Sequence, residues 1–158
     1  MKKIIFHSPL FLAAFILLIC AGFKVNKRSG GVPVAIIVNA ENPVNTLTAG
    51  EVKLYWLRKI KSRWPVINKN IKPVDRKSKC SEQETFYWKV LSMTTDDVET
   101  YFITRQYQNA QKPQEKFNSD KEIIEFVSEE PGAIGFINAA SFSGEAKSKV
   151  KVVLTVNN

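Results

Sequence analysis

Histidine and cysteine are nearly absent from this sequence of 158 residues. It contains one histidine, His7, and two cysteines, Cys20 and Cys80. We expect His7 and Cys20 to lie in a leader segment that is removed, which leaves Cys80 alone in the mature chain. A Ser–His–Asp triad, a Cys–His nucleophile, a zinc site of Cys and His, and an intramolecular disulfide each need more of these residues. The sequence therefore predicts a protein that is not an enzyme and that needs no metal or cofactor.

Long apolar runs are also missing, except near the N-terminus. Two lysines precede an unbroken apolar run over residues 10–19, and small residues follow at positions 20–22. This order is typical of an export signal, so we interpret residues 1–22 as a cleaved signal peptide and expect a periplasmic or secreted protein. The run is shorter than the roughly 20 residues of a spanning helix. An uncut inner-membrane anchor and a lipoprotein leader remain the alternatives.

Acidic residues are the minority charge, at 15 against 23 lysines and arginines, and the formal net charge is +8. Asp75 is the only acid in a basic stretch between positions 58 and 79. The basic residues of that stretch are Arg58, Lys59, Lys61, Arg63, Lys69, Lys72, Arg76, Lys77 and Lys79. The stretch is either a solvated face or a patch for anionic partners such as lipid headgroups. Nucleic acid is a third reading, and the expected export argues against it.

Periodicity and helix-start signals predict an α/β domain over residues 32–158, joined to the leader by a flexible tether at 23–31. Strands are expected at residues 32–39, 71–75, 133–137 and 150–156. Three helices are expected to begin at capping boxes, in which two side chains three residues apart satisfy free amides at the helix start. These pairs are Thr48 with Glu51, Ser81 with Glu84, and Ser119 with Glu122. A further helix is expected from Thr95, and residues 109–118 are expected to form a loop.

The large apolar side chains are interpreted as core residues. Four aromatic residues lie at core spacing on the expected helices: Trp56, Phe86, Trp88 and Phe102. Trp64 stands beside a proline in the basic stretch, and we interpret it as a packed anchor for its loop. Alternation in the last strand predicts that four side chains share one face. They are Val150, Val152, Leu154 and Val156.

Three segments form a recognisable pattern: residues 38–65, 71–91 and 129–137. The pattern is a helix, a basic stretch with tryptophan, a strand that ends in Asp-Arg, a second helix, and then Pro-Gly-Ala-Ile-Gly with an aromatic residue. In this order the segments resemble the phosphate-binding proteins of ABC transporters, which are two-lobed periplasmic binding proteins of the type II fold. The resemblance covers about residues 34–138. It implies one lobe of that fold, as a single three-layer-like domain with a mixed sheet and about four helices.

The resemblance also implies a candidate anion site. In the full-length family, an arginine stands four residues before a Ser-Gly-Thr triplet at a helix start, and these groups hold the phosphate. Arg76 matches that arginine, whereas Cys80, Ser81 and Glu82 stand in place of the triplet. Glu82 brings a negative charge to the helix start, where the family has hydroxyl and backbone donors. From the residues alone, Ser81 is first a helix cap and Cys80 first a small apolar filler.

Two functions remain open at this point. The first is an exported, non-enzymatic substrate-binding-like domain that binds phosphate or another small oxyanion for an ABC transporter permease. The second is an envelope interaction module that reuses the scaffold, with a basic patch for anionic partners and no role in solute transport. The chain has room for about one lobe, whereas the resembling family closes two lobes around its ligand. Membrane contact is expected only through the leader or the basic patch.

Overall fold

The computed structural model describes residues 31–59, 63–110 and 114–157. The expected signal peptide and all but the last residue of the expected tether lie outside these ranges. Within the described residues, no helix is both long enough and apolar enough to span a bilayer.

Five strands form one mixed sheet with the order β3-β2-β4-β1-β5. In chain order they are β1 (Val34–Asn39), β2 (Lys72–Arg76), β3 (Glu115–Phe117), β4 (Ala133–Asn138) and β5 (Val150–Val156). β2 runs parallel to β3 and β4, whereas β1 runs antiparallel to β4 and β5. The predicted α/β class and mixed sheet are confirmed. β3 lies within the predicted loop over 109–118, because three residues are too few to give a periodic signal.

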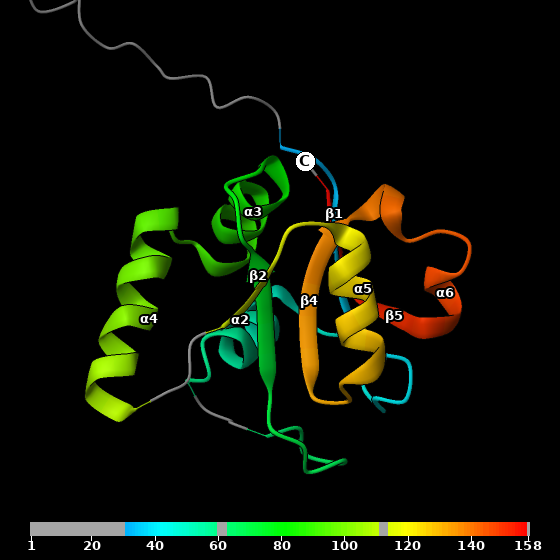
Figure 1. The fold of residues 1–158 in the computed structure, drawn as a ribbon, viewed down its shortest axis with the longest axis horizontal. Coiled ribbons are helices and arrows are strands. Elements are labelled where there is room, and N and C mark those ends of the chain that lie inside the picture. Colours follow the sequence, from blue (N-terminus) through cyan, green and yellow to red (C-terminus); the bar gives the residue numbers. More distant parts are fainter. Residues whose placement is uncertain (1–30, 60–62, 111–113, 158) are drawn as a thin grey trace, which may run out of the picture.

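Helices cover both faces of the sheet, so the domain has three layers. The helices are α2 (Ala49–Trp56), α3 (Ser81–Phe86), α4 (Thr95–Asn109), α5 (Asp120–Glu129) and α6 (Ala146–Lys149). A π-helical turn, η1 (Tyr87–Leu91), extends α3, and a 3-10 turn, η2 (Ala139–Ser141), follows β4. Figure 1 shows α5 in front of the sheet, with α2 and α3 behind it and α4 to one side.

Strand β1 is buried along its whole length, as its run of β-branched residues predicts. Val34, Ile36 and Val38 pack in the core cluster on the side of α2 and α3. Ala35 and Ile37 point the opposite way, into the cluster formed with α5. The alternation of a strand thus divides one apolar run between two cores, and this fixes β1 as the centre of the packing.

Strand β5 departs from the prediction that its apolar residues share one face. Ile36 pairs with Leu154, but the next residue, Ile37, pairs with Val152, so Val153 is an extra residue in the ladder. Such a bulge moves the following side chains to the other face. Val152 consequently packs on the α5 side, whereas Leu154 packs on the α2 and α3 side. The single-face prediction is wrong for this reason.

Three of the four helical aromatics behave as predicted. Trp56 and Phe86 are fully buried, and Phe102 is partly buried against the same core cluster. Trp88 is 49% exposed, so its prediction as a core residue is wrong. It lies in the π-helical turn η1, whose wider turn changes the spacing of inward positions from the α-helical one.

Trp64 is confirmed as a packed anchor. Its side chain is 1% exposed, and its indole Nε1 donates a hydrogen bond to the backbone oxygen of Gly132 at 3.0 Å. The ring also lies 4.7 Å from that of Tyr55, measured between centroids. The basic loop before β2 is therefore fixed to the turn that leads into β4.

Candidate functional site

The candidate site lies at the end of the sheet where β2 and β4 finish. These two strands are parallel, so their carboxyl ends meet at one edge of the domain. Arg76 is the last residue of β2 and Asn138 is the last residue of β4. Helices α3 and α5 both begin at this end, as Figure 1 shows. Residues far apart in the chain are thereby brought to one place.

Arg76 is buried and binds a carboxylate of its own chain. Its guanidinium Nη2 donates to Oδ1 of Asp120, the first residue of α5, and the two side chains are only 9% and 16% exposed. The second oxygen, Oδ2, accepts from the Ser141 hydroxyl at 2.6 Å and from the Asn138 backbone N–H at 3.2 Å. We call these three donors, from Arg76, Asn138 and Ser141, the donor cluster. They hold one oxyanionic group from three sides.

A buried polar network fixes the backbone beneath Arg76. Asp75 accepts through Oδ1 from the Arg76 backbone N–H at 2.7 Å and from Gln83 Nε2 at 3.0 Å. The Tyr87 hydroxyl donates to the other oxygen of Asp75, and burial, together with the Asp75 charge, raises the pKa of Tyr87. Asp75 and Gln83 are 1% and 4% exposed. The network ties the end of β2 to α3 and so sets the position of Arg76.

Two polar atoms beside the site lack partners. Arg76 Nε and Gln83 Oε1 are buried and make no hydrogen bond within the described part of the chain. A buried donor without an acceptor costs free energy, so the Arg76 guanidinium retains capacity for a further acceptor. An arginine that presents two donors can hold an oxyanion through parallel hydrogen bonds.

Glu82 also faces this site. Its Oε1 accepts from the Asn138 side-chain amide at 3.0 Å. Burial acts to raise the pKa of Glu82, but the Asn138 hydrogen bond and the Arg76 charge are among the effects that outweigh it, so the pKa lies below its ordinary value. Glu82 is therefore ionised at neutral pH, and its hydrogen bond to Asn138 places a second negative charge next to the donor cluster.

The predicted capping box of Ser81 with Glu84 is wrong. Helix α3 begins at Ser81, so the capping position falls on Cys80, whose side chain makes no capping hydrogen bond. The Ser81 hydroxyl instead lies 3.4 Å from Glu82 Oε2 and is exposed to solvent. Burial is the main effect that raises the pKa of the half-buried Cys80 thiol, which therefore stays protonated at neutral pH.

Of the other two predicted capping boxes, the first is complete and the second is partial. Thr48 and Glu51 form the full reciprocal pair at the start of α2. Ser119 caps α5 by accepting from the Glu122 N–H at 3.2 Å, but the Glu122 carboxylate accepts from Asn118 instead of returning the bond.

These caps predict unequal effects of two alanine substitutions. Ser119→Ala should lower the free energy of unfolding by about 1 kcal/mol, because it removes the acceptor for a free amide of α5. Ser81→Ala should change it by less than about 0.5 kcal/mol, as an exposed side chain without a capping bond. Urea unfolding of both variants measures the difference. Equal losses in the two variants would contradict this account of the helix starts.

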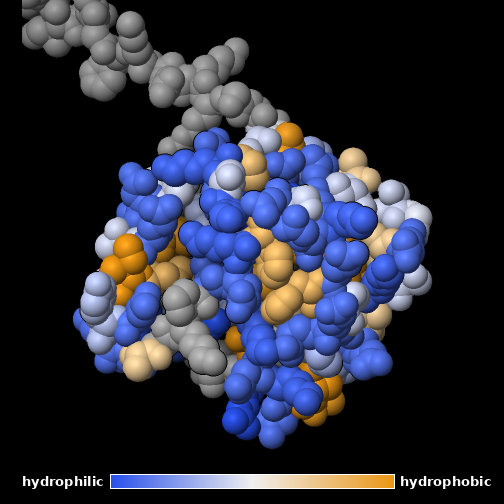
Figure 2. Space-filling view, in the orientation of Figure 1, coloured by the Kyte–Doolittle hydropathy of each residue, from blue (hydrophilic) through white to orange (hydrophobic). Residues whose placement is uncertain are grey.

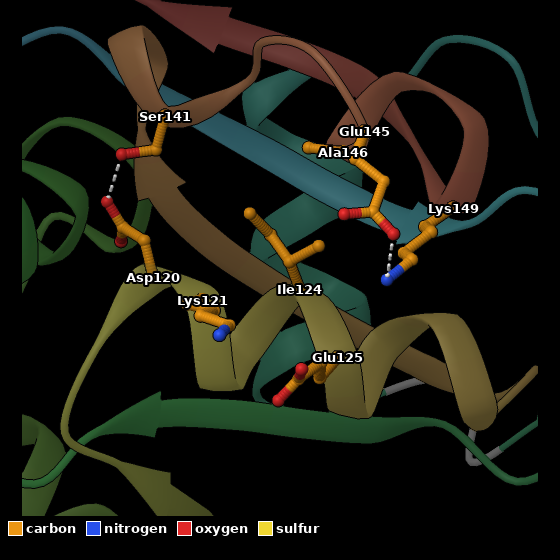
Figure 3. Close-up of a pocket in the computed structure, with 8 residues that line it drawn as sticks. All are labelled: Asp120, Lys121, Ile124, Glu125, Ser141, Glu145, Ala146 and Lys149. Atoms are coloured by element: carbon orange, nitrogen blue, oxygen red, sulfur yellow. Dashed lines mark hydrogen bonds and ion pairs between the residues drawn. The ribbon is translucent and has the colours of Figure 1, made fainter.

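An open groove of about 570 Å³ adjoins the donor cluster. Asp120 and Ser141 lie at one end of it, with α5 on one side and α6 on the other (Figure 3). The remainder is lined by Lys121, Ile124 and Glu125 of α5, by Ala146, and by the ion pair between Lys149 and Glu145 at 2.9 Å. Asp120 is thus shared between the buried Arg76 and a space open to solvent.

The basic stretch is distributed over several environments. Arg76 is buried, Lys72 pairs with Glu130, and Lys79 lies 3.9 Å from Asp96. Three other lysines are exposed, Lys59, Lys69 and Lys77, while Lys61 lies outside the described residues. The face drawn in Figure 2 is mainly hydrophilic, with a small apolar area at its centre. Among the residues that the structure describes, no three His, Cys, Asp or Glu side chains are grouped as they would be to hold a metal ion.

No family model matches the chain, and no curated protein matches it in sequence. Solved structures match its fold. An ABC-type phosphate transport receptor from Vibrio cholerae matches with a TM-score of 0.58 and 21% identity, over 79% of this chain and 47% of that one. PstS from Borrelia burgdorferi matches with a TM-score of 0.57 and 15% identity, over 79% and 48%. A protein from Clostridium perfringens, crystallised with bound phosphate, matches with a TM-score of 0.58 and 18% identity, over 79% of this chain and 46% of that one.

The chain has the fold of about half of such a binding protein. It spans less than half the length of the solved structures that it matches, which fits one lobe. This result confirms the fold implied by the sequence resemblance. Within this periplasmic binding protein-like fold, Asn138 links Glu82 to Asp120, the carboxylate that Arg76 binds. Ser81 lies at the exposed start of α3.

Sequence reasoning missed Asp120, Asn138 and Ser141. These residues reach Arg76 only through the parallel pairing of β2 with β4 and the start of α5. The separation between Arg76 and Asp120 is 44 residues along the chain. The one local signal was the helix start predicted at Ser119, which places an acidic residue in the first turn of α5.

Proposed function

We propose that the chain is an exported, non-enzymatic, substrate-binding-like domain that takes a small oxyanion such as phosphate at Arg76. The observation that carries this proposal is the buried guanidinium at the end of β2, which already holds an oxyanionic group together with Asn138 and Ser141. The fold is that of proteins named for phosphate transport, which supports the same ligand class. An ABC transporter permease is the partner implied, with the periplasm as the location given by the leader.

The charges at the site make weak binding the expected result. Asp120 binds Arg76 directly, and Asn138 donates hydrogen bonds to both Asp120 and Glu82, so two carboxylates lie at the site. Two unit charges at about 4 Å repel by about 4 kcal/mol at an effective dielectric constant of 20. The site also adjoins an open groove, so a bound anion meets water, which weakens each hydrogen bond to it. We therefore expect millimolar rather than micromolar affinity for phosphate.

A second candidate function is an envelope interaction module without a solute. The pairing of Arg76 with Asp120 favours it, because a site already filled by its own chain does not need a ligand. In that case the exposed lysines would serve an anionic partner. The two candidate functions differ in whether a free anion ever replaces the Asp120 carboxylate at Arg76.

Calorimetric titration with phosphate separates these functions. Glu82→Thr should raise phosphate affinity at least tenfold, about 1.4 kcal/mol, because it removes an ionised carboxylate and adds a hydroxyl donor near Arg76. Glu84→Thr is the matched control, since Glu84 lies two residues further on in α3 and is exposed. It should leave the affinity within about twofold of wild type.

The same titration decides against the proposal if neither the wild type nor Glu82→Thr takes up phosphate at millimolar concentration. The interaction module would then be the better account of the domain. Sulfate, titrated in parallel, reports whether the site accepts tetrahedral oxyanions in general.

A further inference from the structure

We propose that Asp120 is a built-in competitor for the oxyanion at Arg76, so that the domain rests with its own ligand site occupied. This inference rests on the proposed function and adds its regulation. Asp120 engages the Arg76 guanidinium, the Ser141 hydroxyl and the Asn138 backbone N–H through its two carboxylate oxygens. An external oxyanion needs these same donors. Binding of one therefore requires release of the other.

The competition is strongly weighted toward the internal carboxylate. Asp120 is the first residue of α5, and the Ser119 side chain and the Glu122 N–H fix that helix start. A group attached at the right distance acts at an effective concentration of millimolar or more, without the entropy cost of bringing in a free ion. A free anion with the same intrinsic affinity as the Asp120 carboxylate must exceed that effective concentration before it occupies Arg76 in half of the molecules.

The structure also gives the displaced carboxylate a place to go. Asp120 lines the end of the open groove between α5 and α6, with Ser141 beside it (Figure 3). The groove is lined by Lys121 and Lys149, by two carboxylates, Glu125 and Glu145, and by the apolar Ile124 and Ala146. Because the groove is open, a carboxylate turned outward meets solvent there. Exchange needs only a rotation of one side chain at the start of α5, with no change in the sheet.

Arg76 Nε gives an external anion an advantage over Asp120. Arg76 is 8% exposed, and among the described residues its Nε has no hydrogen-bond partner while Asp120 is bound through Nη2. A tetrahedral oxyanion has more acceptor positions than a carboxylate already shared among three donors, so it can engage Nε as well. An external anion therefore gains a hydrogen bond from Arg76 Nε that Asp120 does not make.

Chemical rescue of Asp120→Ala tests the inference in the full chain. Phosphate should bind this variant at least tenfold more tightly than it binds the wild type. Acetate, which replaces the missing carboxylate group, should raise the melting temperature of Asp120→Ala but leave that of the wild type unchanged. The control is Asp96→Ala, which removes a carboxylate that is 88% exposed in the first turn of α4, and it should behave as the wild type does. Adding Arg76→Ala to Asp120→Ala should abolish both effects.

Each other outcome has a defined meaning. Equal phosphate affinities for wild type and Asp120→Ala would overturn the competitor role and leave the proposed function standing. No phosphate or acetate binding by either protein would overturn both. If Asp120→Ala is unfolded alone, recovery of its melting transition by phosphate or acetate supports the inference, and failure of both to restore it overturns it.

Discussion

Arg76→Ala is expected to remove phosphate binding and to lower the free energy of unfolding by about 3–5 kcal/mol. Asp120 would keep its charge in a site that is only 16% exposed, with the arginine that neutralises it gone. A buried ion that loses its partner retains its desolvation cost, which makes this kind of change more damaging than loss of an exposed pair. Urea unfolding measures the stability, and calorimetric titration measures the binding.

Lys77→Ala is the matched control for this prediction. Lys77 is the next residue in the chain and is exposed, so its removal should change stability by less than about 0.5 kcal/mol and should weaken phosphate binding slightly and mainly at low salt. Arg76→Lys keeps the charge but loses the planar fork, so it should recover part of the stability and little of the binding. If Arg76→Ala were as stable as Lys77→Ala, the ion pair with Asp120 would not be structural.

Gly132→Ala is expected to destabilise the fold by about 3 kcal/mol through a steric clash. A Cβ atom at this position would lie 2.1 Å from the backbone oxygen of Asn70, which cannot move without disturbing β2. The backbone oxygen of Gly132 also accepts from the Trp64 indole at 3.0 Å and from the Lys72 N–H at 2.9 Å. Displacement of this residue therefore loosens the loop before β2 as well as the turn before β4.

The same substitution at Gly50 provides the control. Gly50 lies in the first turn of α2, and the nearest atom to a Cβ there is Thr48 Oγ1 at 3.9 Å. Gly50→Ala should stabilise the protein by about 0.5–1 kcal/mol, because alanine loses less backbone entropy in a helix. Thermal unfolding of the two variants should move in opposite directions, and a loss of stability in both would refute the steric argument.

The sequence was most informative where structure depends on neighbouring residues. The β-branched run of β1 predicted a strand buried on both faces, and Thr48 with Glu51 predicted the start of α2. The same reasoning failed at Ser81, because a Ser-x-x-Glu pattern does not show which residue the helix begins on. It also failed at Val153, since a bulge depends on the partner strand as much as on the strand itself.

The candidate site was predictable only in part. Arg76 could be found from a local pattern, since it stands at the end of a strand before a helix. Its occupant could not, because Asp120 reaches it through the parallel pairing of β2 and β4 and the packing of α5. Cys80 and Ser81 stay predictions as ligands; the structure gives them a half-buried thiol and an exposed hydroxyl at the start of α3. Side chains that meet across a sheet follow from topology, which local patterns do not encode.

Amide chemical-shift mapping of the wild-type protein during a phosphate titration tests the central claim most directly. The account predicts saturable shift changes at millimolar phosphate that concentrate on Arg76, Glu82, Asp120, Asn138 and Ser141, where the donor cluster and its two carboxylates lie. It predicts only small, linear changes at the exposed lysines Lys69 and Lys77, which meet the anion as diffuse charges. Changes confined to those lysines, or no changes at all, would contradict an oxyanion site at Arg76.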